Sequence, residues 1–247
     1  MTIGPRNRAR RIFGVSVLVT AFLYAIPFGR AIAWPLVLTS TLAHELGHGV
    51  AAAILGGNFH ALRIYPDASG AAIWSGAFGR VATAAVAAAG LLGPAIAAFL
   101  LLAVGRVERR ARTSLGILGT ALCMIALVLV RNPFGVLFTV LLGSVLLLVA
   151  LRMPHASQAV VILVAVQLAL SVFARSDYLF TPTAITSVGR APSDVAVMAD
   201  ALLLPYWFWG ATCGVLSVFL LWQGIRLFFG RRIGAGRVAS VEARSRR

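Results

Sequence analysis

Ionisable residues are scarce in this chain of 247 amino acids: Asp, Glu, Lys and Arg make up 12% of it, and lysine is absent. A soluble globular protein carries about 25% charged residues, whereas here 60% of the residues are hydrophobic. This composition excludes a water-soluble monomer. It also excludes an intrinsically disordered chain, which is poor in apolar residues. We therefore expect a protein embedded in lipid.

Acidic residues are rarer still: the chain has seven of them and 22 arginines, which gives a net charge of +15. Fourteen arginines fall in three clusters, at 6–11, 106–112 and 231–247. Basic clusters beside apolar stretches are typical of membrane proteins. No groove-reading motif accompanies them, so we expect the partner to be the lipid bilayer and no nucleic acid.

Seven apolar stretches approach the roughly 20 residues that a helix needs to cross a bilayer. They are 12–29, 32–55, 81–104, 114–130, 133–151, 157–174 and 203–229. The sequence thus predicts an all-α polytopic membrane protein with about six to seven transmembrane helices. We expect a single integral-membrane domain over 1–247, with a basic N-terminal segment (1–11) and a basic C-terminal tail (231–247).

The first stretch also resembles a secretory signal peptide, because a basic segment precedes it and Ala31-Ile32-Ala33 resembles a cleavage site. Its apolar run is long for a signal peptide, and the charged Arg30 lies where a signal peptidase would recognise its cleavage site. We expect this stretch to be retained as a helix.

The arginine clusters conflict with one another if every stretch crosses the membrane. Three stretches separate 6–11 from 106–112, which places these clusters on opposite sides, while four separate 106–112 from 231–247. The positive-inside rule then fails for one cluster or for two, unless one stretch is a partial crossing. The charge pattern alone leaves the orientation open.

One motif carries catalytic chemistry, the sequence His44-Glu45-Leu46-Gly47-His48 in the second stretch. On a helix, residues four apart share a face, so both imidazoles can bind one zinc ion. Glu45, beside the first ligand, suits the role of general base toward a water molecule. The chain has only four histidines and three glutamates, and ionisable groups in a membrane segment are costly and usually functional. We predict a zinc site at His44 and His48 with Glu45 as the catalytic base.

A catalytic zinc site needs a third protein ligand. The metzincin pattern would place Gly and His where this chain has Ala51 and Ile54. Glu108 and Glu242 lie among arginines and are interpreted as solvated charges. His60 and His155 lie in an alternating segment and in a short loop. The ligand is therefore sought among the aspartates.

Four aspartates remain. Asp67 lies in the turn sequence Tyr65-Pro66-Asp67-Ala68-Ser69-Gly70. Asp194 follows Ser193 at the start of a predicted helix, where a carboxylate also interacts favourably with the helix dipole. Asp200 is six residues further on. We favour Asp194 as the third metal ligand, with Asp177 as the alternative.

The chain resembles the site-2 protease family of intramembrane zinc metallopeptidases, in particular its short bacterial branch without a PDZ domain. The resemblance rests on an ordered series of motifs from about residue 35 to 225. They are His44-Glu45-Leu46-Gly47-His48-Gly49, Leu55-Gly56-Gly57, Tyr65 to Gly70, Ala89-Gly90-Leu91-Leu92-Gly93-Pro94, Arg131-Asn132-Pro133-Phe134-Gly135, Ser193-Asp194-Val195, Leu204-Pro205 and Trp207.

This resemblance implies a zinc-dependent endopeptidase that cuts membrane-protein or peptide substrates in or beside the bilayer, in a bacterial cytoplasmic membrane. It implies zinc binding by His44 and His48, water activation by Glu45, and an aspartate ligand from a later segment. It also implies a site facing the cytoplasm, which would place both residues 58–75, which follow the motif, and the N-terminus on that side. The chain departs from the family in lacking any Asp-Gly, because Asn132-Pro133-Phe134-Gly135 stands where Asn-Pro-Asp-Gly is sought.

Residues 58–75 alternate around a turn and predict a β-hairpin at the membrane face, after the helix that carries the histidines. Its edge can pair with an extended substrate, or the hairpin can be a mere connection. The missing Asp-Gly motif also leaves an alternative function: a non-proteolytic membrane protein that binds zinc or a partner on a protease-like scaffold.

Overall fold

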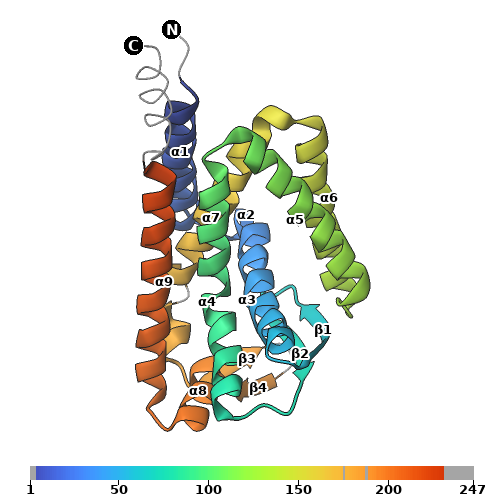
Figure 1. Cartoon of the computed structure of the whole chain (residues 1–247), viewed down its shortest axis with the longest axis vertical. Coiled ribbons are helices and arrows are strands. Elements are labelled where there is room, and N and C mark those ends of the chain that lie inside the picture. The colour runs from blue at the N-terminus through green and yellow to red at the C-terminus, as the bar shows by residue number, and fades with distance from the viewer. Residues whose placement is uncertain (1–3, 175, 187–188, 231–247) are drawn as a thin grey trace, which may run out of the picture.

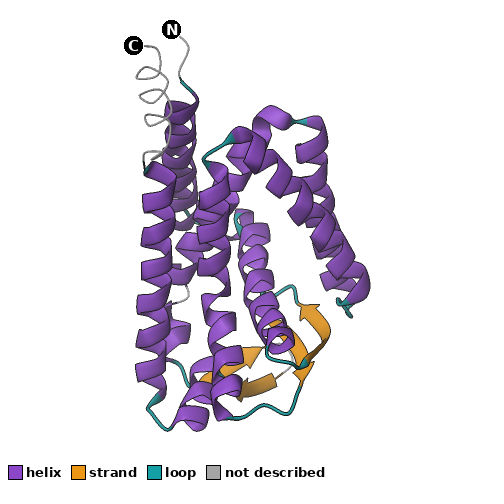
Figure 2. Cartoon of the chain, in the orientation of Figure 1, coloured by secondary structure: helices purple, strands orange, loops and turns teal. Residues whose placement is uncertain are grey.

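The computed structural model describes residues 4–174, 176–186 and 189–230, and it consists mostly of helices (Figures 1 and 2). The predicted basic tail, 231–247, lies outside this part. The elements are α1 (Pro5–Ala25), α2 (Gly29–Ile32), α3 (Trp34–Ile54), β1 (Asn58–Ile64), β2 (Gly70–Ser75), α4 (Arg80–Gly105), α5 (Glu108–Val128), α6 (Pro133–Arg152), α7 (Pro154–Ala174), the 3-10 helix η1 (Ser176–Phe180), β3 (Thr183–Thr186), β4 (Gly189–Pro192), α8 (Asp194–Leu202) and α9 (Tyr206–Phe229).

Within the described residues, five helices are long and apolar enough to cross a membrane: α4, α5, α6, α7 with its continuation into η1, and α9. A helix satisfies its own backbone hydrogen bonds, which lipid cannot do, so apolar stretches of this length fold as helices in a bilayer. The predicted fold, a polytopic helical membrane protein with a β-hairpin after the HExxH helix, is confirmed.

The stretches 12–29 and 32–55 also form helices, but α1 and α3 follow one another in the same direction (Figure 1). Both pack along α7. Tyr24, near the end of α1, accepts a hydrogen bond from Gln167 at 2.9 Å, and Ser40, on α3, donates one to Ser171 further along α7 at 2.7 Å. Together α1 and α3 make one passage from the N-terminal end toward the hairpin.

This arrangement removes the conflict between the arginine clusters. Arg8 at the start of α1 forms an ion pair with Glu108 at the start of α5, with an N–O distance of 3.1 Å. Arg10 donates a hydrogen bond to the Phe229 carbonyl at the end of α9, so the first two clusters and the end of α9, after which the third cluster follows in the sequence, belong to one end of the molecule. The β1–β2 hairpin lies at the other end (Figure 1). The expectation that the hairpin and the N-terminus share one side is therefore wrong.

The β1–β2 hairpin is antiparallel and runs back along α3. The Trp34 indole N–H, at the start of α3, donates a hydrogen bond to the Pro66 carbonyl at 2.8 Å, and the Thr41 hydroxyl donates one to the Ala68 carbonyl at 2.8 Å. Because the turn reaches the first half of α3, strand β2 passes beside the HExxH motif.

The outer edge of β1 is covered by the connection between α5 and α6. Leu62 donates a backbone hydrogen bond to the Leu129 carbonyl at 2.8 Å and accepts one from Arg131 at 3.0 Å. The Asn132 amide continues this pairing, since its Oδ1 accepts from Ile64 N–H at 3.2 Å and its Nδ2 donates to the Ile64 carbonyl at 2.6 Å. Asn132 therefore behaves like one further strand residue.

We expect Asn132→Ala to destabilise the fold, because it removes two partly buried hydrogen bonds worth about 1 kcal/mol each. The midpoint of thermal unfolding in detergent should fall by about 4–8 °C. The control is Asn58→Ala, at an exposed position of β1, which should leave the midpoint within about 1 °C. Equal midpoints for the two variants would contradict the role given to Asn132.

Candidate metal centre

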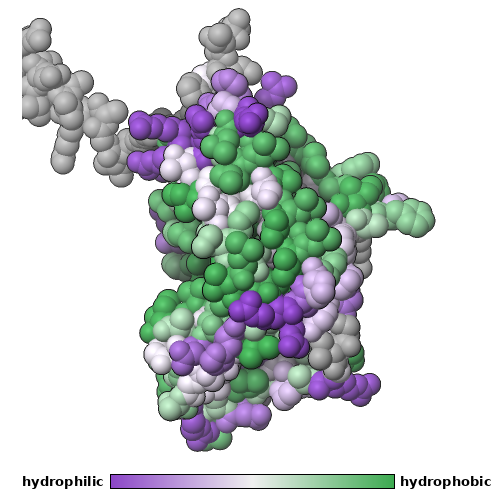
Figure 3. All heavy atoms as spheres, turned by 90° about the vertical axis from the view of Figure 1, so that its right-hand side faces the viewer, coloured by the Kyte–Doolittle hydropathy of each residue, from purple (hydrophilic) through white to green (hydrophobic). Residues whose placement is uncertain are grey.

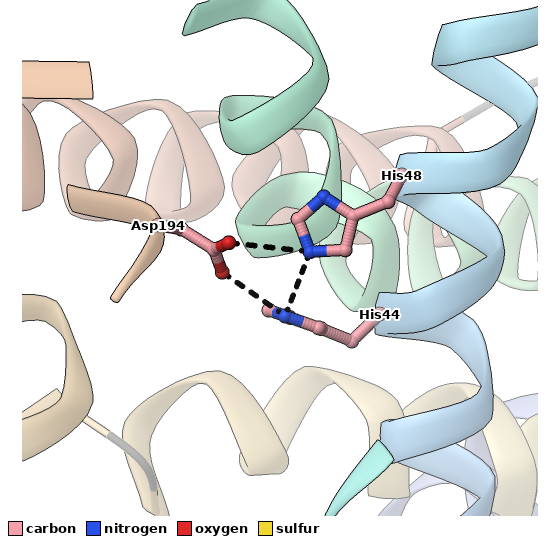
Figure 4. Close-up of side chains that lie close together, drawn as sticks. All are labelled: His44, His48 and Asp194. Carbon is pink, nitrogen blue, oxygen red and sulfur yellow. Dashed lines mark hydrogen bonds and ion pairs between the residues drawn. The ribbon is translucent and has the colours of Figure 1, made fainter. Parts of the chain in front are cut away.

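The two histidines of the motif converge one turn apart on α3. Their Nε2 atoms lie 3.2 Å from each other (Figure 4). The other ring nitrogen of His48, Nδ1, lies 2.9 Å from the Val86 carbonyl of α4, which fixes Nδ1 as the donor and leaves Nε2 free to bind a metal ion. A carbonyl bonded to the distal nitrogen in this way is the usual support of a metal-binding imidazole.

Close packing of α3 against α4 sets the position of these rings. A Cβ built on Gly47 would lie 2.2 Å from the Ala89 carbonyl oxygen, and one built on Gly93 would lie 2.5 Å from the Ala43 carbonyl oxygen. A Cβ on Gly90 would lie 2.1 Å from His48 Nε2. Small residues at such a crossing let membrane helices approach closely, and here the space left by Gly90 is filled by the imidazole.

Asp194 completes the cluster from the opposite side (Figure 4). Its Oδ2 lies 3.1 Å from His44 Nε2, and its Oδ1 lies 3.3 Å from His48 Nε2. Asp194 is the first residue of α8, and the helix begins there because the Ser193 hydroxyl caps it by accepting a hydrogen bond from the Ala196 N–H at 3.3 Å. This cap fixes the backbone from which the carboxylate projects.

The electrostatics of the cluster favour an ionised carboxylate. Burial raises the pKa of the Asp194 carboxyl, but the imidazoles of His48 and His44 lower it by more, and the resulting pKa lies below its ordinary value. The N-terminus of α8 adds a favourable helix dipole at the same place. Asp194 is thus ready to bind a cation.

The donor set fits zinc. Two imidazole nitrogens and one carboxylate oxygen, all within 4.8 Å of one another, are the ligand types found in catalytic zinc sites, which keep a fourth position open. The structure thus brings together His44, His48 and Asp194, the three residues predicted as ligands.

Tyr178 lies beside this cluster and had not been predicted from the sequence. Its hydroxyl donates a hydrogen bond to Asp194 Oδ2 at 3.5 Å, and its ring meets the His44 ring edge to face, with 6.1 Å between the centroids. No spacing links Tyr178 to the HExxH motif. Only the fold, which brings η1 against α8 and α3, identifies it.

Glu45 is buried and faces the hairpin. A Cβ built on Gly70, the first residue of β2, would lie 2.6 Å from Glu45 Cγ and 2.8 Å from Oε1. The backbone N–H of Ala72 forms a hydrogen bond with the Glu45 carboxylate. The helix therefore presents its ligands toward α8 and its carboxylate toward β2.

A cavity of about 470 Å³ opens at the cluster. His44 and Glu45 form one wall of it. The β1–β2 turn with Gly70, Tyr178 and strand β3 contribute to the rest of its lining. His44, Glu45 and Gly70, the first residue of β2, therefore line the same cavity.

The remaining aspartates and the Asn-Pro sequence lie elsewhere. Asp67 accepts hydrogen bonds from the N–H and hydroxyl of Ser69 in the predicted turn. Asp200 lies further along α8, and Asn132 lies at the outer edge of β1. Asp177, the alternative ligand, lies in η1, but its side chain is outside the described part of the structure.

The fold and the cluster define a polytopic membrane protein with a His–His–Asp centre. The Peptidase M50B-like family matches residues 15–224, so the chain belongs to this family of site-2 protease-like intramembrane metallopeptidases. The resemblance seen in the motifs is confirmed. Neither the curated proteins nor the solved structures contain a match to the chain.

We expect Gly90→Ala to weaken zinc binding at least tenfold, because the added methyl group occupies the space of the His48 ring. Affinity is measured on purified protein by competition with a chromogenic chelator. The control is Gly116→Ala in α5, where the nearest atom to the added Cβ is 3.7 Å away. Unchanged affinity in both variants would show that the α3–α4 contact does not position His48.

Proposed function

We propose that this protein is a zinc-dependent intramembrane endopeptidase. The observation that carries the proposal is the convergence of His44, His48 and Asp194 beside a cavity that is lined by His44 and Glu45. Membership in a family of zinc peptidases supports the same conclusion. The helices that carry the ligands are held in place: α3 packs closely on α4, and Ser193 caps the start of α8.

His44, His48 and Asp194 would hold the zinc ion. When bound, zinc polarises the scissile carbonyl and lowers the pKa of water. Glu45 takes a proton from the water molecule as its oxygen attacks the carbonyl carbon. Glu45 then delivers that proton to the amide nitrogen as the C–N bond breaks. Burial against β2 keeps Glu45 in place for both transfers.

The free edge of β2 offers a binding site for an extended substrate. Leu62 directs its backbone N–H and carbonyl toward residues 129–131, so its partner Ala72 directs its own away from β1. In the described part of the chain no strand pairs with this side of β2. The Ala72 N–H on this side is bonded to the Glu45 carboxylate, so a peptide added to this edge bonds to the Ala72 carbonyl and passes Glu45.

The substrate class follows from the surroundings. Because the helices that carry the cluster, α3 and α8, pack on α4, one of five candidate membrane spans, we propose that the substrates are membrane proteins or peptides whose helix unwinds near the cavity. The site of action is the cytoplasmic membrane of a bacterium.

Glu45→Gln should abolish cleavage and retain about one zinc ion per chain. The amide keeps the shape of the side chain but cannot accept the proton, and general-base catalysis is worth about 10²–10⁴-fold. Both quantities are measured on the same purified sample, zinc by elemental analysis and cleavage on a membrane-peptide substrate. Cleavage at the wild-type rate would refute the mechanism.

Asp194→Ala should lower zinc affinity by more than about 100-fold, because the loss of a ligand costs more than the 10–100-fold cost of losing a residue that only supports one. Asp177→Ala is the matched control and should retain affinity. If neither change weakens binding, Asp194 is not the ligand.

Full zinc binding without cleavage of any membrane peptide would instead favour a non-proteolytic, zinc-binding membrane protein.

A further inference from the structure

Arginine side chains gather at the end of the molecule that is opposite the hairpins. The helix termini there are held together by arginine hydrogen bonds to carbonyls. Arg106 donates to the Gly230 carbonyl at 2.9 Å, and Arg112 donates to the Ala150 carbonyl at 2.8 Å. The arginines with described side chains at this end are Arg8, Arg10, Arg11, Arg106, Arg109, Arg110, Arg112, Arg152 and Arg226. We refer to this set as the arginine end.

The two ends of the molecule differ strongly in charge. The arginine end contains a single described acidic side chain, Glu108, which pairs with Arg8, so its net charge is about +8 at neutral pH, with His155 counted as neutral. Outside the metal centre, the hairpin end has four arginines and two aspartates with described side chains, a net charge of +2. They are Arg63, Arg80, Arg131, Arg190, Asp67 and Asp200.

A hydrophobic band separates these ends. On the face drawn in Figure 3, green apolar side chains lie between two purple hydrophilic zones, one of them at the top, the end where α1 begins and α9 ends. The exposed arginines lie at the ends of candidate membrane spans, such as Arg109 at the start of α5 and Arg226 near the end of α9. This is the depth at which phospholipid headgroups surround a membrane protein, and it favours lipid over a soluble polyanion as the partner.

We propose that the arginine end lies against the anionic headgroups of the cytoplasmic leaflet and that the metal centre opens toward the opposite side of the membrane. Arginines within a few residues of span ends set orientation because they are retained on the cytoplasmic side. This orientation is the reverse of the one that the family resemblance implies. It does not depend on whether Glu45 catalyses cleavage.

For the proposed protease, this orientation determines which part of a membrane-spanning substrate is cut. A membrane segment would be cut toward its non-cytoplasmic end, because the HExxH motif lies in the part of α3 that is near the hairpin. Peptide products of such a cut leave on the outer side.

The test measures which end is accessible from outside the cell. Cys123→Ser and Cys213→Ala remove the cysteines of the chain. Single cysteines are then introduced by Met153→Cys, beside Arg152, or by Ala77→Cys, between β2 and α4. Both positions are exposed, and neither carries a charge or contributes to the metal centre. Bacterial spheroplasts are treated with a membrane-impermeant maleimide, before or after permeabilisation.

We expect the Ala77→Cys protein to be labelled in intact spheroplasts and the Met153→Cys protein only after permeabilisation. The reverse pattern overturns the proposal, and so does equal labelling of both without permeabilisation. Zinc content of the purified variants verifies that they are folded, so a failure of orientation is distinguished from a failure of the proposed function.

A second comparison tests whether the arginines cause the orientation. In the Met153→Cys background, Arg109→Gln, Arg110→Gln and Arg152→Gln together should raise labelling in intact spheroplasts at least threefold. The matched control neutralises Arg63, Arg131 and Arg190 to Gln and should leave labelling unchanged. Equal effects of the two sets, or no effect of either, would refute the role of the arginine end.

Discussion

The contact between α3 and α4 determines the geometry of the candidate metal centre. Gly47 and Gly93 let the two backbones meet, and Gly90 leaves the space that the His48 ring fills. At this separation the Val86 carbonyl reaches His48 Nδ1, so the same contact selects the tautomer and directs Nε2 toward Asp194. One side chain added at this crossing would displace ring and backbone together.

Helix α3 directs the two histidines and the glutamate of the motif toward different parts of the structure. His44 and His48 face the carboxylate of α8, whereas Glu45 faces β2 and the Ala72 N–H. In the proposed mechanism, a base held apart from the His–His–Asp cluster keeps its oxygens available for a proton, while other elements hold the proposed metal ligands. The cavity between β2 and β3 is where the two sets of groups meet.

Much of the candidate metal centre was predictable because the chain contains so few acidic residues and histidines. The spacing of His44 and His48 and the intervening Glu45 follow from helix periodicity, and Asp194 was favoured because few carboxylates remained and because it follows a capping serine. Tyr178 and the free edge of β2 were not predictable in this way, since they depend on contacts between elements distant in sequence. Counting each apolar stretch as one membrane crossing placed the hairpin and the N-terminus on the same side, which is wrong. Hydropathy gives the length of a helix but not its direction, and α1 and α3 follow one another in the same direction.

Asn132 has a mechanical consequence. Its amide ties β1 to the start of α6, and β1 is paired in turn with β2, whose Gly70 touches the Glu45 side chain. A short series of contacts therefore runs from the α5–α6 pair to the Glu45 carboxylate, the proposed catalytic base. We expect a tilt of those two helices, in response to bilayer thickness or to a neighbouring segment, to alter the space beside Glu45, so that the lipid environment acts on the proposed active site.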